Sequence, residues 1–193
     1  MNKKLHLLLI TYIRKSALYT MLLKSKLTGM KKIIFFLGIV IFSLNVFGQT
    51  DTIPPYLSDP TIPSFTIQRA DSSWITKNDL AKKPTLILYF SPDCGHCQLE
   101  TEELITKLKS LGDLQIVMIT SRSIAEMKEF SDRYLLQKFP SIKIGSDPNR
   151  FVTRFYKVKF TPFSALYNKK GKLVKVYADG LDFKELATLV SKG

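Results

Sequence analysis

The two cysteines of this chain stand three positions apart, as Cys94 and Cys97 in the segment SPDCGHCQLE. A disulfide between them closes a very small ring and therefore contributes little to stability. A C-x-x-C pair is suited instead to thiol–disulfide exchange, in which one thiolate attacks a substrate disulfide and the second thiol resolves the mixed disulfide. We predict that Cys94 attacks and that Cys97 resolves.

The residues around the cysteines favour a thiolate at Cys94. The apolar run TLILYF (85–90) precedes them and is typical of a strand buried on both faces of a sheet, and a helix is expected to follow. This order places Cys94 at a helix N-terminus, where free N–H groups and the helix dipole stabilise negative charge. Asp93 is expected to cap that helix and to oppose the thiolate with its own charge. His96 would favour the thiolate and make the disulfide more oxidising.

The rest of the chain alternates apolar strands with helices. The expected strands are SFTIQ (64–68), TLILYF (85–90), LQIVMIT (114–120), SIKIG (141–145) and a hairpin of FSALYN (163–168) and KLVKVYA (172–178). Four helices are expected: from the cysteines to Leu111, from the Ser123–Glu126 capping box onward, from Asp147 to about Val158, and from Asp182 onward. Residues 71–83 are expected to form a turn and a short helix. This order predicts an α/β fold with a central mixed sheet flanked by helices on both faces.

Residues 1–48 are predicted to be a leader. From Met30 onward, two lysines precede an apolar run from Ile33 to Phe47, which ends in a cleavage site before Gln49. The run of about 15 residues is shorter than the roughly 20 that span a bilayer, so cleavage is favoured over membrane attachment through an uncleaved leader. Translation is expected to start at Met30, and the protein is expected in the periplasm or cell envelope, where disulfides persist.

The leader also explains most of the chain's charge. The net charge is +13, but residues 1–49 hold eight basic residues and no acidic one, which leaves 21 basic and 16 acidic residues in 50–193. No basic stripe interleaved with aromatic residues is present, so nucleic-acid binding is not predicted. Residues 49–64 contain four prolines and predict an extended spacer, which leaves 65–193 as the globular domain.

A C-x-x-C motif between a buried strand and a helix resembles the thioredoxin superfamily over most of 65–193. Thr161-Pro162 precedes the strand FSALYN, where the superfamily has a cis-proline that faces the disulfide and binds substrate backbone. The segment between LQIVMIT and Pro162 is similar to the extracytoplasmic TlpA-like branch, which includes cytochrome-c-maturation thioredoxins. Glu100 matches a glutamate of that branch, and the resemblance implies that it exchanges protons with the resolving cysteine.

This resemblance implies a periplasmic protein-disulfide oxidoreductase that uses its CGHC dithiol reductively. Its partners would be protein thiols and disulfides and a membrane redox partner, with no organic cofactor and no metal. Three positions depart from thioredoxin: Asp93 replaces Trp, His96 replaces Pro, and Leu88 replaces a buried Asp. We expect these departures to alter redox potential and partner choice rather than the exchange chemistry.

Three alternatives remain open from the sequence. Cys94, His96 and Cys97 could bind copper or zinc, although a closed zinc site takes four ligands. A peroxiredoxin-like thiol peroxidase would have Pro seven and Thr or Ser three residues before its reactive cysteine; Ser91 fits, but position 87 is Ile. The third alternative is a redox-inactive interaction domain.

Overall fold

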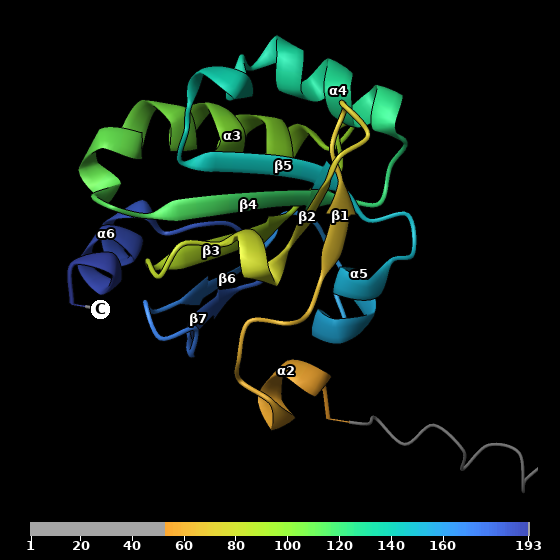
Figure 1. Cartoon of the computed structure of the whole chain (residues 1–193). Helices are drawn as coiled ribbons and strands as arrows, with labels where there is room; N and C mark the ends of the chain where they lie inside the picture. Colours follow the sequence, from red (N-terminus) through yellow and green to blue (C-terminus); the bar gives the residue numbers. More distant parts are fainter. Residues whose placement is uncertain (1–52, 193) are drawn as a thin grey trace, which may run out of the picture. The chain divides into compact units, whose positions relative to one another are not determined.

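The computed structural model describes residues 53–192, which form a seven-stranded sheet with helices on both faces (Figure 1). The strands lie in the order β2-β1-β5-β4-β3-β6-β7. Their bounds are Thr66–Gln68 (β1), Trp74–Thr76 (β2), Thr85–Tyr89 (β3), Gln115–Thr120 (β4), Ile142–Ser146 (β5), Phe163–Tyr167 (β6) and Leu173–Tyr177 (β7). The helices are Pro55–Ser58 (α2), Gly95–Lys107 (α3), Ile124–Arg133 (α4), Phe151–Tyr156 (α5) and Phe183–Lys192 (α6), with short 3-10 turns at Lys77–Asp79 (η1), Leu108–Leu111 (η2) and Leu136–Lys138 (η3).

The sheet is mixed, as the sequence predicts. β3 pairs with β4 and β4 with β5 in parallel, whereas β6 and β7 add antiparallel strands on the other side of β3. All six residues of β4 are buried, which accounts for its uninterrupted apolar run. Tyr89, the last residue of β3, lies opposite Phe163, the first residue of β6. The segment that follows β3 and the segment that precedes β6 therefore lie side by side at the same end of these two strands.

The two faces of the sheet carry separate apolar clusters. One cluster joins the sheet to α3, α4 and α6 through residues such as Leu104, Phe130 and Leu186. The other joins it to α5 and the N-terminal segment through Val152, Tyr156 and related side chains. Because apolar side chains cover both faces, α3 begins from a rigid position at the end of β3.

Three elements differ from the sequence-based expectation, and the first is the helical turn α2, which lies within the spacer predicted to be extended. Within 71–83, Trp74–Thr76 form a strand that pairs with β1, and only Lys77–Asp79 form a helical turn. The helix expected from Asp147 begins at Phe151, because Arg150 has a left-handed backbone with φ 52°. The Asp147 carboxylate still accepts the backbone N–H of Val152 at 2.8 Å, five positions further on.

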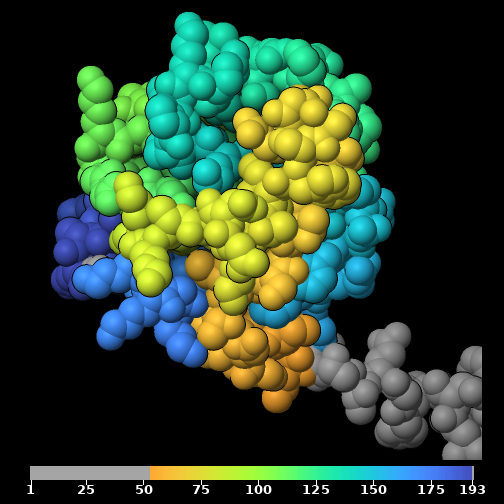
Figure 2. All heavy atoms as spheres, viewed as in Figure 1, coloured from red at the N-terminus to blue at the C-terminus, as the bar shows by residue number. Residues whose placement is uncertain are grey.

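The N-terminal part of the described chain packs on the domain (Figure 2). Ile62 is 7% exposed and belongs to a core cluster, and Pro60 accepts a backbone hydrogen bond from Leu173 at 2.8 Å. The packed region therefore begins before residue 65. The predicted leader, the start at Met30 and residues 49–52 lie outside the described residues. In the described part, every helix is too short or too polar to cross a bilayer.

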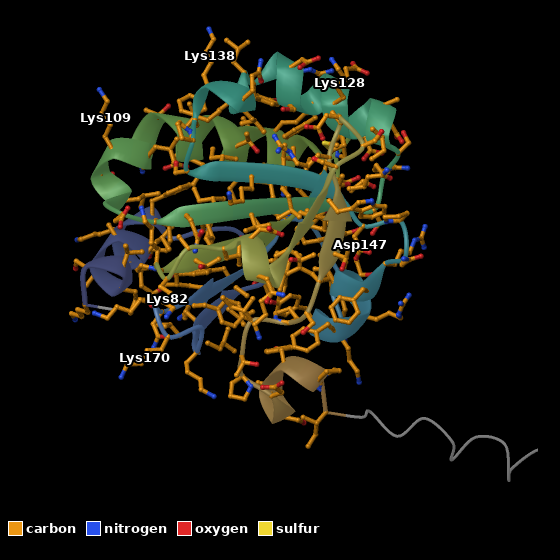
Figure 3. The ribbon with its side chains drawn as sticks, viewed as in Figure 1. Lys82, Lys109, Lys128, Lys138, Asp147 and Lys170 are labelled. Carbon is orange, nitrogen blue, oxygen red and sulfur yellow. The ribbon has the colours of Figure 1, made fainter. Side chains whose placement is uncertain are left out.

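Surface lysines of the domain are spread over several elements. Figure 3 labels lysines on the loop before β3, on η2, on α4, on η3 and in the β6–β7 turn, and all of them are exposed; these are Lys82, Lys109, Lys128, Lys138 and Lys170. Ion pairs, such as the one between Lys128 and Asp132, also offset part of this positive charge.

Candidate active site

Cys94 occupies the N-cap position of α3. Its backbone is extended, with φ −84° and ψ 115°, and its sulfur accepts a hydrogen bond from the backbone N–H of Cys97 at 3.4 Å. The prediction that Asp93 caps this helix was therefore wrong by one residue. The cap places the sulfur where unpaired helix N–H groups stabilise negative charge.

The two thiols, both free, differ strongly in environment. Burial alone would raise the pKa of Cys94, but hydrogen bonds with Cys97 and Thr161 outweigh it and lower this pKa below the ordinary value of 9.0. Cys97 is 1% exposed, and burial, together with the adjacent Cys94 thiol, raises the pKa of Cys97 to about 12. The first cysteine is thus suited to act as a nucleophile, and the second is held as a protonated thiol.

Thr161 and Pro162 lie against the motif, as the resemblance implies. The peptide bond between them is cis, and the Thr161 carbonyl oxygen lies 3.5 Å from the sulfur of Cys94. The antiparallel pairing of β3 with β6 brings these residues together across 67 positions of sequence.

Glu100 lies one turn beyond Cys97 on α3 and is 8% exposed. Its Oε2 accepts the backbone N–H of Leu181 at 2.7 Å, while its buried Oε1 has no hydrogen-bond partner among the described residues. Burial is the main reason that the pKa of Glu100 is raised; the Leu181 hydrogen bond opposes this, and Glu103 adds to it. This carboxyl group can therefore hold a proton more readily than an ordinary glutamate. His96, by contrast, lies between the two cysteines and is exposed.

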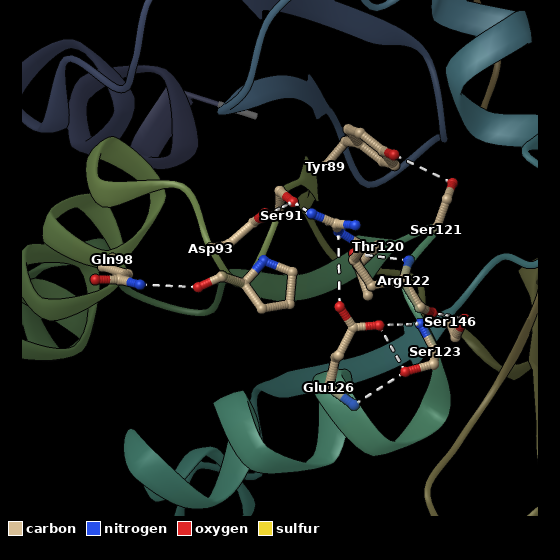
Figure 4. Close-up of polar contacts among 11 residues, drawn as sticks. Tyr89, Ser91, Asp93, Gln98, Thr120, Ser121, Arg122, Ser123, Glu126 and Ser146 are labelled. Carbon is tan, nitrogen blue, oxygen red and sulfur yellow. Dashed lines mark hydrogen bonds and ion pairs between the residues drawn. The ribbon is translucent and has the colours of Figure 1, made fainter.

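An unexpected polar network holds the loop before Cys94 (Figure 4). Arg122, two residues after the end of β4, forms an ion pair with Asp93 and donates a hydrogen bond from Nε to the Ser91 hydroxyl at 3.3 Å. The Ser91 hydroxyl also donates to Asp93, and this bond, with the guanidinium as a further cause, lowers the pKa of Asp93. Arg122 also lies 3.9 Å from Glu126.

The network had no signal in the sequence, because Arg122 is 28 positions from Cys94 and approaches only through the β3–β4 pairing. A second brace comes from Gln98, whose side-chain amide donates to the Pro92 carbonyl at 2.8 Å. These contacts hold residues 91–93, the loop that positions Cys94.

The metal-binding alternative gains no support from the geometry. Within residues 53–192, no group of three or more His, Cys, Asp and Glu side chains is arranged to hold a metal ion. Cys94, His96 and Cys97 therefore do not converge on such a site.

Comparison with known proteins agrees with the fold and the cysteine motif. Residues 59–176 match the AhpC/TSA family, which is more than half of the chain. No curated protein matches significantly. Among solved structures, a secreted disulfide oxidoreductase of Mycobacterium tuberculosis is 19% identical with a TM-score of 0.57, covering 67% of this chain and 96% of its own.

Two further solved structures have a similar fold. A thiol peroxidase of Chromobacterium violaceum is 19% identical with a TM-score of 0.57, covering 69% of this chain and 85% of its own. An exposed lipoprotein thioredoxin of Streptococcus pneumoniae is 18% identical with a TM-score of 0.54, covering 68% of this chain and 100% of its own. At these identities the likeness shows the thioredoxin-like fold.

Proposed function

Because the chain belongs to the AhpC/TSA family and has a thioredoxin-like fold, we propose that it is a thiol–disulfide oxidoreductase acting on protein disulfides. The observation that carries this proposal is the difference between the two thiols. Cys94 has a lowered pKa at a helix N-cap, whereas Cys97, whose backbone N–H lies 3.4 Å from the Cys94 sulfur, is buried with a pKa of about 12. Such a pair separates an attacking thiolate from a resolving thiol.

The proposed reduction proceeds in two exchanges. The Cys94 thiolate attacks one sulfur of the substrate disulfide, so that a bond forms between Cys94 and the substrate and the other substrate sulfur leaves as a thiolate. Cys97 then loses its proton and attacks Cys94, which releases the second substrate thiolate and forms the Cys94–Cys97 disulfide. The substrate gains two electrons and two protons, and a dithiol donor must reduce the protein again.

Glu100 is proposed to take the proton of Cys97 in the second step. A thiol with a pKa of about 12 is almost never ionised at neutral pH, so its attack needs a nearby base. Glu100 lies one turn away, and its buried Oε1 has no partner in the described chain. Thr161 and Pro162 are proposed to bind the substrate backbone, and His96 to tune the disulfide from an exposed position.

The setting of the reaction is also part of the proposal. The predicted leader supports a periplasmic or cell-envelope location, and the TlpA-like resemblance supports a membrane redox partner that keeps the dithiol reduced. The reduction potential tests the direction. A value near that of thioredoxin, about −270 mV, supports a reductase, and a value near about −120 mV would identify an oxidant instead.

Activity of single-cysteine variants tests the exchange itself. Reduced wild-type protein should reduce a model disulfide protein with dithiothreitol as donor, and Cys94→Ser should abolish this activity. Cys97→Ser should still form a mixed disulfide that gel electrophoresis detects. Full activity of Cys94→Ser, or cysteines that fail to react with an alkylating probe, would refute the proposal and favour a redox-inactive domain.

A thiol peroxidase is a second candidate, since family membership and Ser91, three residues before Cys94, both favour it. Ile87 departs from the peroxidase pattern, and the Ser91 hydroxyl already contacts Asp93 and Arg122. Consumption of hydrogen peroxide by the reduced protein distinguishes the two functions. A rate well above that of free dithiothreitol, lost in Cys94→Ser, would establish the peroxidase.

A further inference from the structure

A groove of about 830 Å³ runs beside the C-x-x-C motif. Its walls come from the first turns of α3, the segment before β6, and the loop between β7 and α6. Residues of all three parts line it, including His96, Leu99, Glu103, Phe160, Asp179 and Gly180. Thr161 also lines the groove, and its carbonyl oxygen lies 3.5 Å from the Cys94 sulfur. A chain bound in the groove would thus bring its disulfide close to Cys94.

The rim of the groove carries two large exposed apolar side chains. Phe160 is 76% exposed and Leu99 is 65% exposed. Phe160 directly precedes Thr161, and Leu99 follows Cys97 by two positions on α3. Single exposed apolar residues are common, but two of them on one groove beside a nucleophile suit an apolar side chain of a substrate.

The charged groups that line the groove are acidic. They are Glu100, Glu103, Asp179 and Asp182, and no lysine or arginine is among the lining residues. Lys107 compensates Glu103 through an ion pair, and Asp182 accepts N–H groups at the start of α6. Asp179 and Asp182 remain exposed. The groove thus carries negative charge, although residues 50–193 have 21 basic and 16 acidic residues.

Glu100 adds a second feature that points to a ligand. Its side chain is more than nine-tenths buried and lines the groove, yet Oε1 has no hydrogen-bond donor among the described residues. Because Oε1 is itself buried, a molecule in the groove would act on Glu100 through its charge rather than through a direct hydrogen bond. A cationic group there would stabilise the ionised carboxylate.

We propose that the groove selects substrates whose disulfide cysteine is flanked by a basic residue and an apolar residue. This inference rests on the proposed exchange function and names the substrate class for the same site. The apolar side chain packs between Phe160 and Leu99, and the basic side chain faces the exposed carboxylate of Asp179. An acidic substrate segment meets like charge there and is disfavoured.

Three synthetic peptides of equal length test the proposal. Each carries one cysteine in a mixed disulfide with thionitrobenzoate, flanked by Lys and Leu, by Glu and Leu, or by Lys and Ser. The reduced full chain attacks the peptide sulfur and releases thionitrobenzoate, which is followed by absorbance in a single turnover. We expect the Lys–Leu peptide to react about fivefold faster than the Glu–Leu peptide, and this preference to shrink in high salt.

Variants assign the preference to the groove. Asp179→Asn should reduce the Lys-over-Glu preference, whereas Asp132→Asn, on α4 and outside the groove, should retain it. Phe160→Ser should slow the Lys–Leu peptide toward the rate of the Lys–Ser peptide. Equal rates for all three peptides, with Cys94→Ser inactive, would overturn the groove proposal and leave the exchange function standing. Release that Cys94→Ser does not abolish would instead overturn the exchange function.

Discussion

The difference between the two thiols predicts how each cysteine reacts alone. We consider Cys97→Ser, which retains only Cys94, and Cys94→Ser, which retains only Cys97. The rate of alkylation by iodoacetamide should rise with pH through a midpoint below 9.0 in the first variant, because the hydrogen bonds with the residue-97 backbone N–H and with Thr161 remain and the serine hydroxyl can donate in place of the Cys97 thiol. The second variant should show no midpoint in the accessible range.

The structure sets the size of the difference. A pKa below 9.0 for Cys94 against about 12 for Cys97 makes the Cys94 thiolate at least about a thousandfold more abundant at neutral pH. Intrinsic nucleophilicity falls with pKa, with a slope of about 0.4–0.5, which offsets about thirtyfold of that advantage. Ionisation alone therefore predicts at least about thirtyfold faster alkylation of Cys94. The 1% exposure of Cys97 should widen the gap further.

The Cys94→Ser substitution also changes the environment of Cys97. It removes the hydrogen bond and the charge of the Cys94 sulfur, which are two causes of the raised pKa of Cys97, but burial is the largest cause and remains. Alkylation in urea, where both sites are unfolded, gives the matched control and should equalise the rates. Equal rates in the folded variants, or a faster reaction of Cys97, would refute the assignment of attacking and resolving thiols.

Three further substitutions test the surroundings of the cysteines. Arg122→Met should raise the alkylation midpoint of Cys94, because Asp93 loses its ion-pair partner and its negative charge then opposes the thiolate. Adding Asp93→Asn should restore the midpoint. An unchanged midpoint in Arg122→Met would show that Arg122 does not compensate the charge of Asp93. Glu100→Gln should raise the free energy of urea unfolding at pH 8 and leave it nearly unchanged below about pH 4. The reason is that the stability from a carboxyl group with a raised folded-state pKa is present below its unfolded pKa and is lost as the pH rises. The same change at both pH values would argue against a raised pKa of Glu100. Gly180→Ala should destabilise the fold by about 1–3 kcal/mol, because the φ of Gly180 is +98° and the new Cβ would lie 3.2 Å from Glu100 Oε2. The control, Gly95→Ala, should change stability less, because no heavy atom lies within 4 Å of its new Cβ.

Local sequence signals predicted the elements that carry the cysteines. The run TLILYF became β3, and the spacing of apolar residues after Cys97 became α3. The capping box at Ser123 was also confirmed, since its hydroxyl accepts the Glu126 N–H while the Glu126 side chain accepts the Ser123 N–H. These features depend on neighbours within a few positions, which the sequence displays directly.

Features that depend on distant partners were harder to predict. The cap assigned to Asp93 passed to Cys94, because Arg122 and Ser91 bind the Asp93 carboxylate instead. Trp74 joined a strand rather than a short helix, because it pairs with β1. Glu100 was found from a family motif, but its contact with Leu181, 81 positions away, needed the structure. Register and topology, rather than local propensity, set each of these contacts.

Two charged neighbours of Cys94, Asp93 and His96, have weaker effects in the structure than the sequence alone suggests. Asp93 should suppress the thiolate and His96 should promote it, yet Arg122 neutralises the first and exposure to solvent weakens the second. The remaining influences on Cys94 are the backbone N–H groups at the N-terminus of α3 and a hydrogen bond with the Thr161 side chain, both of which lower its pKa. Stabilising the thiolate makes a disulfide more oxidising, so weakening both neighbours reduces the shift in reduction potential that Asp93 and His96 would otherwise cause.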